Sequence, residues 1–399
     1  MRKAMMNRKL LKVAIAMALV SGASTAYATN GDQMLGVTAT QWGMAGAVVA
    51  APQDSGTILT NPAGLSLLNI EEVRLDMGFG FLNPPRTANG EESDSNLYLI
   101  PSGAVAFKID EQFTFGIGMA GLSGMGVDFA DIMSGAPGNQ NVVTTKQFYR
   151  IAPGFSYQVD DKLALGAALN IDYQSLALDN AKMHLPQNQV YGFGVTLGLI
   201  YKLNDAFQLG ASYVSKQSMS AFKWNTTTID PTSPIPTLHG GKYSMTMDAP
   251  HTLALGLAYQ PGNGLLVEAD IKYIGFSDVL DVVMLSGPSG DIPMNFGWDD
   301  QVVFSLGVQK EISDKMTLRA GINYGESPIG EEDVDNNIGS LAITESHFSI
   351  GATRKLGKHI EGSVSYLHAL NNEMASNSGS SNTIELEQNV VNLQISYKM

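Results

Sequence analysis

The sequence predicts an all-β protein, a fourteen-stranded antiparallel transmembrane β-barrel with an N-terminal hatch, or plug, in its lumen. Three observations predict this fold. The chain opens with a secretory signal, it then repeats segments in which apolar residues alternate with small or polar ones, and the connections between segments are alternately short and long. We therefore divide the chain into a cleaved signal peptide at residues 1–28, a hatch at 29–70 and a barrel at 71–399.

The first 28 residues contain the three parts of a secretory signal. Positive charges come first, an apolar stretch from Val13 to Val20 follows, and small residues end at Ala26-Tyr27-Ala28. The apolar stretch is too short to cross a bilayer as a helix, which needs about 20 residues. We expect cleavage after Ala28; the alternative is an ordinary amphipathic helix at the N-terminus.

The composition excludes several classes of protein. Cysteine is absent, so disulfide scaffolds, thiolate nucleophiles and cysteine-ligated metals are excluded. The chain beyond the signal has no apolar run of about 18 residues or more, which excludes a helical membrane protein. Removing the five positive signal residues takes the formal net charge from −14 to −19, which opposes binding to nucleic acid. We expect no cofactor and no metal.

From residue 71 onward the chain alternates with a period of two. In residues 191–201 the odd positions are large and apolar or aromatic, whereas the even positions begin with Gly192 and Gly194. The same division recurs in residues 113–119, 162–173, 253–259, 316–324 and 391–397. The large face, with Tyr and Phe at the segment ends, suits lipid, and the small face suits the lumen, where it leaves free volume. A soluble sandwich would turn its bulky residues inward.

The connections predict the number of strands. Short turns occupy residues 109–111, 159–162, 203–206, 260–264, 312–315 and 356–359. Longer polar loops lie near residues 83–95, 128–143, 179–189, 219–250, 277–299, 326–343 and 371–384. Six turns and seven loops connect fourteen strands, and an even number with short periplasmic turns and longer external loops is typical of outer-membrane barrels. Closure removes the unpaired edges that lipid would not tolerate.

Residues 29–70 break this pattern. The segment is rich in Gly, Ala, Val and Thr, has no long alternation, and ends with Asn-Pro-Ala-Gly-Leu at 61–65. Its composition differs from the charged, Pro- and Glu-rich type that stays disordered. We therefore favour a small plug in the lumen over a disordered leader.

Several residues resemble those of a known family. The run Gly-Met-Ala-Gly-Ala at 43–47, and then Asp54, Thr57, Asn61, Pro62, Ala63, Gly64 and Leu65, resemble the hatch signature of the FadL/TodX-type outer-membrane transporters of long-chain fatty acids and aromatic hydrocarbons. Residues 157–170, 323–329 and 366–369 resemble a turn and strand ends of the same family. Two features depart from it. Met44 and Ala45 stand where members often carry an arginine, and the chain ends in Met399, with its aromatic residue at Tyr397.

The resemblance implies the same fold and a transport function. It implies uptake of hydrophobic compounds, most of all long-chain fatty acids, by passive diffusion in the outer membrane of a Gram-negative bacterium. In this family the ligand reaches an internal site beside the hatch and leaves sideways through a gap in the wall. Our candidate gap contains Gly121, Gly124 and Gly126, because repeated glycine weakens a strand and marks a bend or bulge. The alternative is a frayed strand end.

A fatty acid needs a positive partner for its carboxylate in a lumen of low dielectric. Parity places Arg150 and Arg319 on the inward face. Either could bind the carboxylate, or could pair with the lumen acids Glu268 and Asp270 or with hatch residue Asp54. Candidates for apolar contact with the ligand are Trp42, Met44, Ile58 and Leu59, which could equally pack the plug.

The expected partners are a hydrophobic small-molecule ligand, outer-membrane lipid with lipopolysaccharide, and the barrel-assembly machinery; we expect a monomer. Two alternatives remain open. One is a general porin, or a structural barrel whose loop at 225–237 serves adhesion. The other is an outer-membrane enzyme, although the six histidines form no H-x-x-x-H pair and no G-x-S-x-G elbow occurs.

Overall fold

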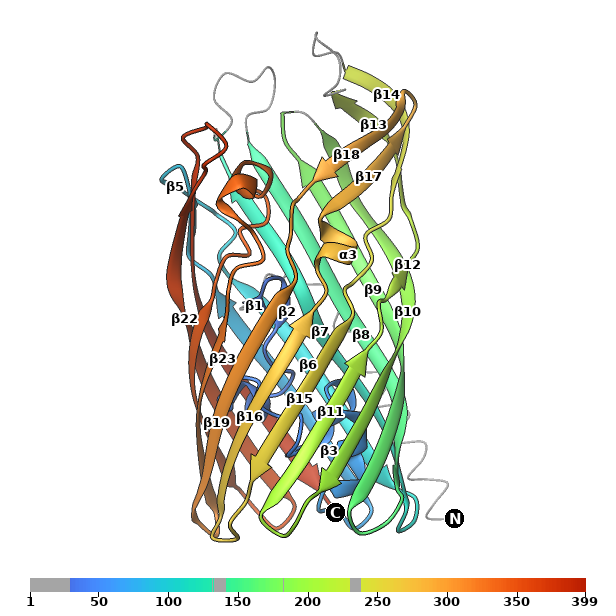
Figure 1. Ribbon diagram of the computed structural model, residues 1–399, viewed down its shortest axis with the longest axis vertical. Helices are drawn as coiled ribbons and strands as arrows, with labels where there is room; N and C mark the ends of the chain where they lie inside the picture. The colour runs from blue at the N-terminus through green and yellow to red at the C-terminus, as the bar shows by residue number, and fades with distance from the viewer. Residues whose placement is uncertain (1–28, 131, 133–140, 182, 230–237) are drawn as a thin grey trace.

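Fourteen antiparallel strands close into a barrel (Figure 1). The computed structural model describes residues 29–130, 132, 141–181, 183–229 and 238–399, so the expected signal and its cleavage site lie outside the described residues. The strands of the wall are β3 (Val73–Asn83), β6 (Tyr98–Lys108), β7 (Phe113–Phe129), β8 (Val142–Gln158), β9 (Leu163–Asp179), β10 (His184–Lys202), β11 (Phe207–Val214), β15 (Thr252–Tyr259), β16 (Leu265–Ile274), β19 (Gln301–Ser313), β20 (Met316–Gly325), β21 (Ser346–Lys355), β22 (Ile360–Ala375) and β23 (Thr383–Lys398). Each pairs with the next, and β23 pairs back with β3. The predicted antiparallel β-barrel and its fourteen strands are confirmed.

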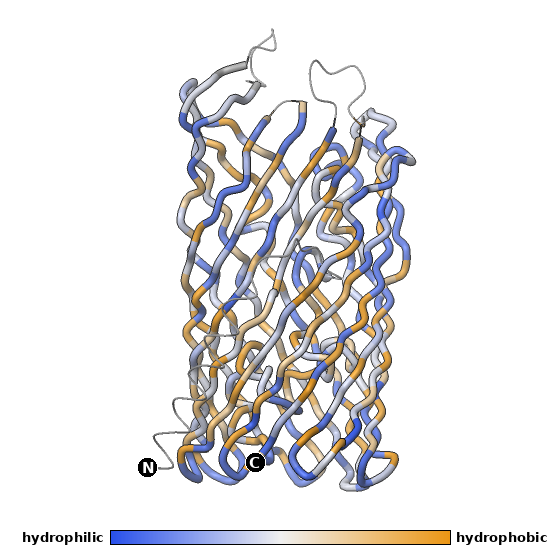
Figure 2. Tube along the Cα trace, turned by 180° about the vertical axis from the view of Figure 1, so that it is seen from behind, coloured by the Kyte–Doolittle hydropathy of each residue, from blue (hydrophilic) through white to orange (hydrophobic). Residues whose placement is uncertain are grey.

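The two faces of the wall follow the period-two pattern. Figure 2 shows hydrophobic and hydrophilic residues alternating along the strands. Large side chains such as Tyr191, Phe193 and Leu197 are exposed on the outer face, with exposed fractions of 58%, 58% and 49%. In β10 this face extends from Tyr191 to Tyr201, which matches the roughly 9–11 residues that a tilted strand needs to cross the bilayer. Aromatic residues at both ends suit the two membrane interfaces.

The external connections contain more strand than the sequence predicts. The regions 219–250 and 277–299 carry a four-stranded sheet made of β13 (Phe222–Ile229), β14 (Leu238–Met245), β17 (Val282–Gly287) and β18 (Gly290–Asn295). The loop expected at 179–189 is short, because β9 and β10 continue past the membrane as a hairpin. Smaller elements in this half are β4 (Arg86–Ala88), β5 (Glu91–Glu92), β12 (Ser218–Met219), α3 (Ser277–Leu280) and η3 (Glu331–Asn336). Part of the proposed adhesion loop, residues 230–237, lies outside the described residues.

Residues 29–70, the N-terminal segment, lie inside the barrel (Figure 1). Their elements are β1 (Thr29–Asn30), β2 (Gln33–Met34), α2 (Ala39–Gly43), η1 (Ser55–Leu59) and η2 (Pro62–Leu67). We call residues 29–34, where β1 pairs with β2, the N-terminal hairpin. None of the helices in the described part of the chain has the length and apolar character that crossing a membrane requires.

Lumen glycines explain how the segment fits. A Cβ on Gly166 would lie 2.2 Å from the Ala63 backbone nitrogen, and one on Gly210 would lie 2.3 Å from the Val49 carbonyl oxygen. Both distances are too short for any side chain, so glycine is required where the two backbones meet. The small residues that we interpreted as leaving free volume are therefore where the N-terminal segment packs.

Candidate functional site

Two side-chain caps hold the expected hatch motif together. Asp54 caps η1, and its Oδ1 accepts a hydrogen bond from the Gly56 N–H at 3.1 Å. Asn61 caps η2, where its Oδ1 accepts from the Ala63 N–H at 3.2 Å and its Nδ2 donates to the Val49 carbonyl at 2.7 Å. Asp and Asn are favoured caps because their oxygens satisfy N–H groups that have no partner within the helix.

The remaining motif residues have structural roles as well. Pro62 occupies the first turn of η2, where its fixed φ suits the start and its missing N–H is not needed. A Cβ on Gly64 would lie 2.4 Å from Thr57 Oγ1. That hydroxyl donates to the Asn61 carbonyl at 2.9 Å and closes the turn. Asp54, Thr57, Asn61, Pro62 and Gly64 thus each have a role in the folding of the segment.

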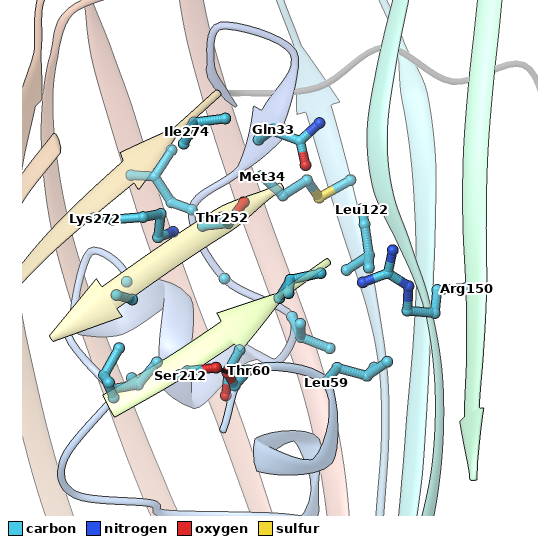
Figure 3. A pocket seen from close by; sticks show the side chains of 18 of the residues that line it. Gln33, Met34, Leu59, Thr60, Leu122, Arg150, Ser212, Thr252, Lys272 and Ile274 are labelled. Atoms are coloured by element: carbon cyan, nitrogen blue, oxygen red, sulfur yellow. Dashed lines mark hydrogen bonds between the residues drawn. The ribbon is translucent and has the colours of Figure 1, made fainter. Parts of the chain in front are cut away.

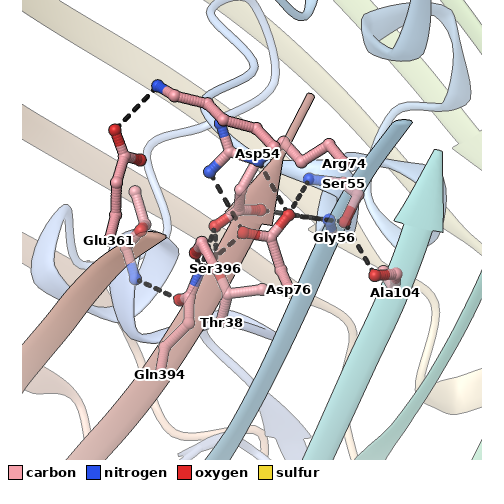
Figure 4. A network of polar contacts seen from close by, with 12 residues as sticks. Thr38, Asp54, Ser55, Gly56, Arg74, Asp76, Ala104, Glu361, Gln394 and Ser396 are labelled. Carbon is pink, nitrogen blue, oxygen red and sulfur yellow. Dashed lines mark hydrogen bonds and ion pairs between the residues drawn. The ribbon is translucent and has the colours of Figure 1, made fainter. Parts of the chain in front are cut away.

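A polar network ties the N-terminal segment to β3 and β23 (Figure 4). The Asp76 carboxylate is its centre, accepting from Arg74 Nε at 2.8 Å and from the Ser55 N–H at 2.8 Å. Gln394 Nε2 donates to Asp76 at 3.1 Å and to Asp54 at 3.3 Å. One guanidinium and one amide therefore hold two buried carboxylates side by side.

On the β16 side the segment is held by the carboxylate pair Glu268 and Asp270. Asp270 Oδ2 accepts from the N–H groups of Val48 at 2.7 Å and Val49 at 3.0 Å. Glu268 Oε1 accepts from the N–H groups of residues 50 and 51 at 2.5 and 3.0 Å. Four backbone donors thus share two buried acceptors. The pairing of these acids with Arg150 or Arg319 that we considered from the sequence is wrong.

On the β7 side the segment is held by its N-terminal hairpin. Gln33 pairs with Ser123 of β7. This is the only β-pairing between β2 and the wall within the described residues. Asp32 Oδ2 accepts from Ser123 Oγ at 2.6 Å and from Lys146 Nζ at 2.5 Å. The Asp32 carbonyl also accepts from the Gly124 N–H at 3.3 Å. The hairpin thus lies against the edge of β7.

The pairing between β6 and β7 ends next to the predicted glycines. Its last register pair is Ser102 with Ala120, although β7 continues to Phe129 while paired with β8. The register with β8 shifts at Leu122, which is the extra residue of a β-bulge. β6 has Pro101, which carries no N–H to donate, next to its last pair with β7. The stretch containing Gly121, Gly124 and Gly126 is therefore a bulged strand edge rather than a frayed end.

Arg86 and Tyr98 cover the edge of β7 farther along the strand, at Gly126. Arg86 Nη1 and the Tyr98 hydroxyl both donate to the Gly126 carbonyl. Arg86 is buried and its guanidinium also contacts the Tyr98 ring. The free edge of β7 is thus covered by the hairpin near Ser123 and by Arg86 near Gly126.

A cavity of about 110 Å³ lies between the N-terminal hairpin and the wall (Figure 3). It is bounded by β7, β8, β11, β15 and β16 and by the N-terminal segment. Its apolar lining includes Met34, Leu59, Leu122, Phe148, Val214 and Ile274. Two cations, Arg150 and Lys272, lie on opposite sides of it. The bulge residue Leu122 lines this cavity and belongs to the part of β7 that does not pair with β6.

The two cations differ in their partners. Arg150 donates from Nε and Nη2 to the two carboxylate oxygens of Asp172, at 2.8 and 3.2 Å, so its charge is neutralised. Lys272 forms no hydrogen bond and no ion pair with the described residues. Asp270, two residues earlier on the same face of β16, acts on it only electrostatically. Of the two, Lys272 is the cation that a ligand carboxylate can pair with.

Arg319 lies elsewhere, at the short-turn end of the lumen. Its Nε donates to Gln53 Oε1 at 2.9 Å and its Nη1 to Thr353 Oγ1 at 2.7 Å. Parity therefore placed both arginines correctly on the inward face, but only Arg150 lines the cavity. Neither arginine pairs with the acids we considered from the sequence.

The apolar candidates divide in the same way. Leu59 lines the cavity, whereas Trp42, Met44 and Ile58 do not. These three are fully buried, with exposed fractions of 1%, 0% and 0%, in clusters that join the N-terminal segment to the wall. Their position indicates packing of the segment.

An apolar cluster leads from the external loops to the cavity. Phe148 and Ile274 belong both to this cluster and to the cavity lining. The cluster also contains the methionines Met125, Met219, Met245 and Met247. Methionine adapts to irregular apolar shapes, so this region suits the passage of varied hydrophobic molecules.

Known proteins resemble this chain along nearly its whole length. Residues 19–398 match the family model described as outer membrane protein transport protein (OMPP1/FadL/TodX). The chain belongs to this family. It is an outer-membrane transporter of hydrophobic compounds in a Gram-negative bacterium and not an enzyme.

Individual relatives support the assignment. The 47 kDa outer membrane protein of Pasteurella multocida is 25% identical over 398 residues, covering 89% of this chain and 90% of that protein. The long-chain fatty acid transport protein of Salmonella typhi is 21% identical, covering 92% and 93%. The crystal structure of the Pseudomonas putida toluene transporter TodX has a TM-score of 0.75 at 21% identity, covering 91% and 99%. A Pseudomonas aeruginosa FadL homologue has a TM-score of 0.74 at 15% identity, covering 92% and 99%. These structures share the fold.

Proposed function

We propose that this protein transports long-chain fatty acids, with Lys272 as the partner of the ligand carboxylate. The observation that carries this proposal is an unpaired ammonium group in a cavity lined mainly by apolar side chains. An unpaired charge in such surroundings is costly, and a carboxylate that binds it removes that cost. A neutral hydrocarbon would leave the ammonium unpaired.

The ligand's route follows from the same geometry. The external apolar cluster accepts the molecule and leads it to the cavity, where the acyl chain contacts Leu59, Phe148 and Ile274. The exit is sideways, between β6 and β7 above Ala120, where the described wall has no strand pairing. The N-terminal segment acts as a hatch that blocks the straight path to the periplasm.

The size of the cavity requires a moving part. A dry cavity of about 150 Å³ binds benzene, so a cavity of about 110 Å³ is too small for a long acyl chain. Met34 lines the cavity and belongs to the N-terminal hairpin. Displacement of this hairpin enlarges the cavity and uncovers the edge of β7 at Ser123 in one movement.

A second candidate ligand is a monoaromatic hydrocarbon. The small volume of the cavity favours it, since a single ring approaches that size without movement of the hairpin. The structural neighbour TodX is named a toluene transporter. The two candidates differ in their dependence on the Lys272 charge, which only the fatty acid uses.

Uptake in a strain that lacks this gene separates the two candidates. We expect the restored gene to support uptake of labelled oleate, and Lys272→Gln to lower it while leaving toluene uptake unchanged. Lys162→Gln, in an exposed periplasmic turn, is the matched control for the charge. If residues 29–64 act as a hatch, their deletion should abolish the restored oleate uptake. Toluene uptake without oleate uptake, with the protein folded in the outer membrane, would overturn the fatty-acid proposal.

Contact with lipopolysaccharide, assembly by the barrel-assembly machinery and a monomeric state stay predictions.

A further inference from the structure

A second cavity, of about 480 Å³, lies at the periplasmic end of the lumen. We call it the periplasmic cavity. It is bounded by the β19–β20 turn, by β21 and β22, and by Thr40 and Gln53 of the N-terminal segment. No residue lines both this cavity and the one beside Lys272. Its rim, at residues 313–315, is exposed, so it opens to the aqueous periplasm.

The geometry points to a binding site for a soluble oxyanion, such as phosphate, with Arg319 as its main donor. The two hydrogen bonds that the Arg319 guanidinium donates within the described residues go to neutral acceptors, Gln53 Oε1 and Thr353 Oγ1. No carboxylate of the described chain lies within ion-pair distance of it. Its Nη2 has no acceptor in the described structure, which leaves N–H groups free toward the cavity. Arg150, by contrast, has both carboxylate oxygens of Asp172.

The surrounding charges favour an anion. Five cations and three acids line the cavity, and counting Asp76, the ion-pair partner of Arg74, leaves an excess of one positive charge. Two of the cations already have partners, since Arg74 pairs with Asp76 and Lys398 pairs with Glu361 at 2.7 Å. The remaining cations, Arg319, Lys315 and Lys355, form no ion pair with the described residues. Two further acids also line the cavity, Glu311 of β19 and Asp314 of the turn, so the net positive charge suits one small anion.

The chemistry of the donors suits an oxyanion more than chloride. A guanidinium presents a planar fork of N–H groups that matches two oxygens of a phosphate or carboxylate. The hydroxyls of Thr40, Thr317 and Ser363 also line the cavity and can donate to further oxygens. Because the cavity lies within the lumen and not on the lipid face, the occupant comes from solution.

An occupant would bridge two parts of the molecule. Thr40 and Gln53 belong to the N-terminal segment, whereas Arg319 and Lys355 belong to the wall. An anion bound to both stabilises the state in which the segment is docked, and mass action makes that stabilisation depend on anion concentration. This effect is independent of the fatty-acid carboxylate at Lys272.

Isothermal titration calorimetry with inorganic phosphate on the full-length protein in detergent tests the site. At matched ionic strength in chloride, we expect saturable binding to the wild type and none to Arg319→Gln. Arg319→Lys, which keeps a point charge without the fork, should recover part of the affinity. Lys355→Gln, an exposed rim variant that does not threaten folding, should weaken binding several-fold. Lys162→Gln, outside the cavity, should bind like the wild type.

Two further readouts make the outcome decisive. Phosphate should raise the unfolding temperature of the wild type but not of Arg319→Gln, while oleate binding stays the same in both. Absence of saturable phosphate binding to the wild type would overturn the site. Equal phosphate binding by the wild type, Arg319→Gln and Lys355→Gln would overturn it as well.

Discussion

The N-terminal segment is attached to the barrel in two different ways on its two sides. Toward β16, residues 48–51 place four consecutive N–H groups on Glu268 and Asp270, and lumen glycines meet the backbone directly. Toward β7, the N-terminal hairpin has one register pair, Gln33 with Ser123, and one carboxylate, that of Asp32. The first attachment is distributed over many contacts, and the second depends on few.

This difference separates a fixed part from a movable part. Breaking the β16 attachment leaves several buried donors without acceptors at once, each at a cost of about 1–3 kcal/mol. Releasing the hairpin breaks the bonds of Asp32, the Gln33–Ser123 pair and the bonds of Thr29 to Gln388 and Thr344, and it frees the edge of β7. We therefore infer that residues 36–70 stay in place during transport while the N-terminal hairpin moves.

A disulfide across the movable side should have the largest effect. Gln33→Cys with Ser123→Cys joins register partners, whose Cα atoms in an antiparallel pair lie about 4.5–5.5 Å apart, within the span of a disulfide. The chain has no other cysteine, so the cross-link is unambiguous. We expect oxidation to remove nearly all oleate uptake and reduction to restore it.

The matched control is a disulfide within the wall. Ser365 and Asn392 are register partners in β22 and β23, whereas the hairpin pairs with β7. Oxidation of that cysteine pair should leave uptake unchanged. Equal uptake by the oxidised and reduced forms of the Gln33–Ser123 variant would show that the ligand passes without movement of the hairpin.

Loss of an acceptor on the fixed side should have the next largest effect, on stability. Glu268→Ala leaves the N–H groups of Ala50 and Ala51 buried without an acceptor, a cost of about 2–6 kcal/mol. We expect a lower unfolding temperature, measured by the loss of heat-modifiable mobility on gels. Glu268→Gln keeps an acceptor oxygen and should lose less. Stability equal to that of the wild type in Glu268→Ala would contradict the distributed attachment.

Weakening the hairpin should have the smallest effect, and in the opposite direction for transport. Asp32→Asn keeps the shape but leaves the buried Lys146 ammonium without its counter-charge, a cost of about 3 kcal/mol to the closed state. The open state should become more populated, so oleate uptake should rise several-fold. Uptake that falls instead would show that Asp32 serves the ligand and not the closed state.

The barrel could be predicted from the sequence because its signals are local. Alternation identifies each strand, and the short or long connection that follows indicates pairing with the next strand in sequence. These two patterns are enough to predict fourteen strands. The external sheet of β13, β14, β17 and β18 could not be assembled from the sequence, because its two local strand pairs are joined by the pairing of β14 with β17 across a long separation in sequence. The fit of the N-terminal segment depends on contacts such as Ala63 with Gly166, which no local pattern reveals.

The site was predictable only in part. Parity gave the inward face of Arg150, but a hairpin centred on the turn at 159–162 would place Ile171 opposite it, one residue away from the observed partner Asp172. Lys272 has the same parity as Glu268 and Asp270, so its inward position could have been found from that signal. Asp32 carries no such signal, because the N-terminal segment has no period from which to infer its partners.

The central claim is that Lys272 binds the carboxylate of the ligand. The most direct test compares the binding of oleate and of oleyl alcohol, which has the same chain without the charge, to the purified wild type and to Lys272→Gln. We predict that the variant loses about 2 kcal/mol for oleate, roughly 30-fold in Kd, and nothing for the alcohol. Oleate binding equal to that of the wild type, or equal losses for both ligands, would contradict this claim.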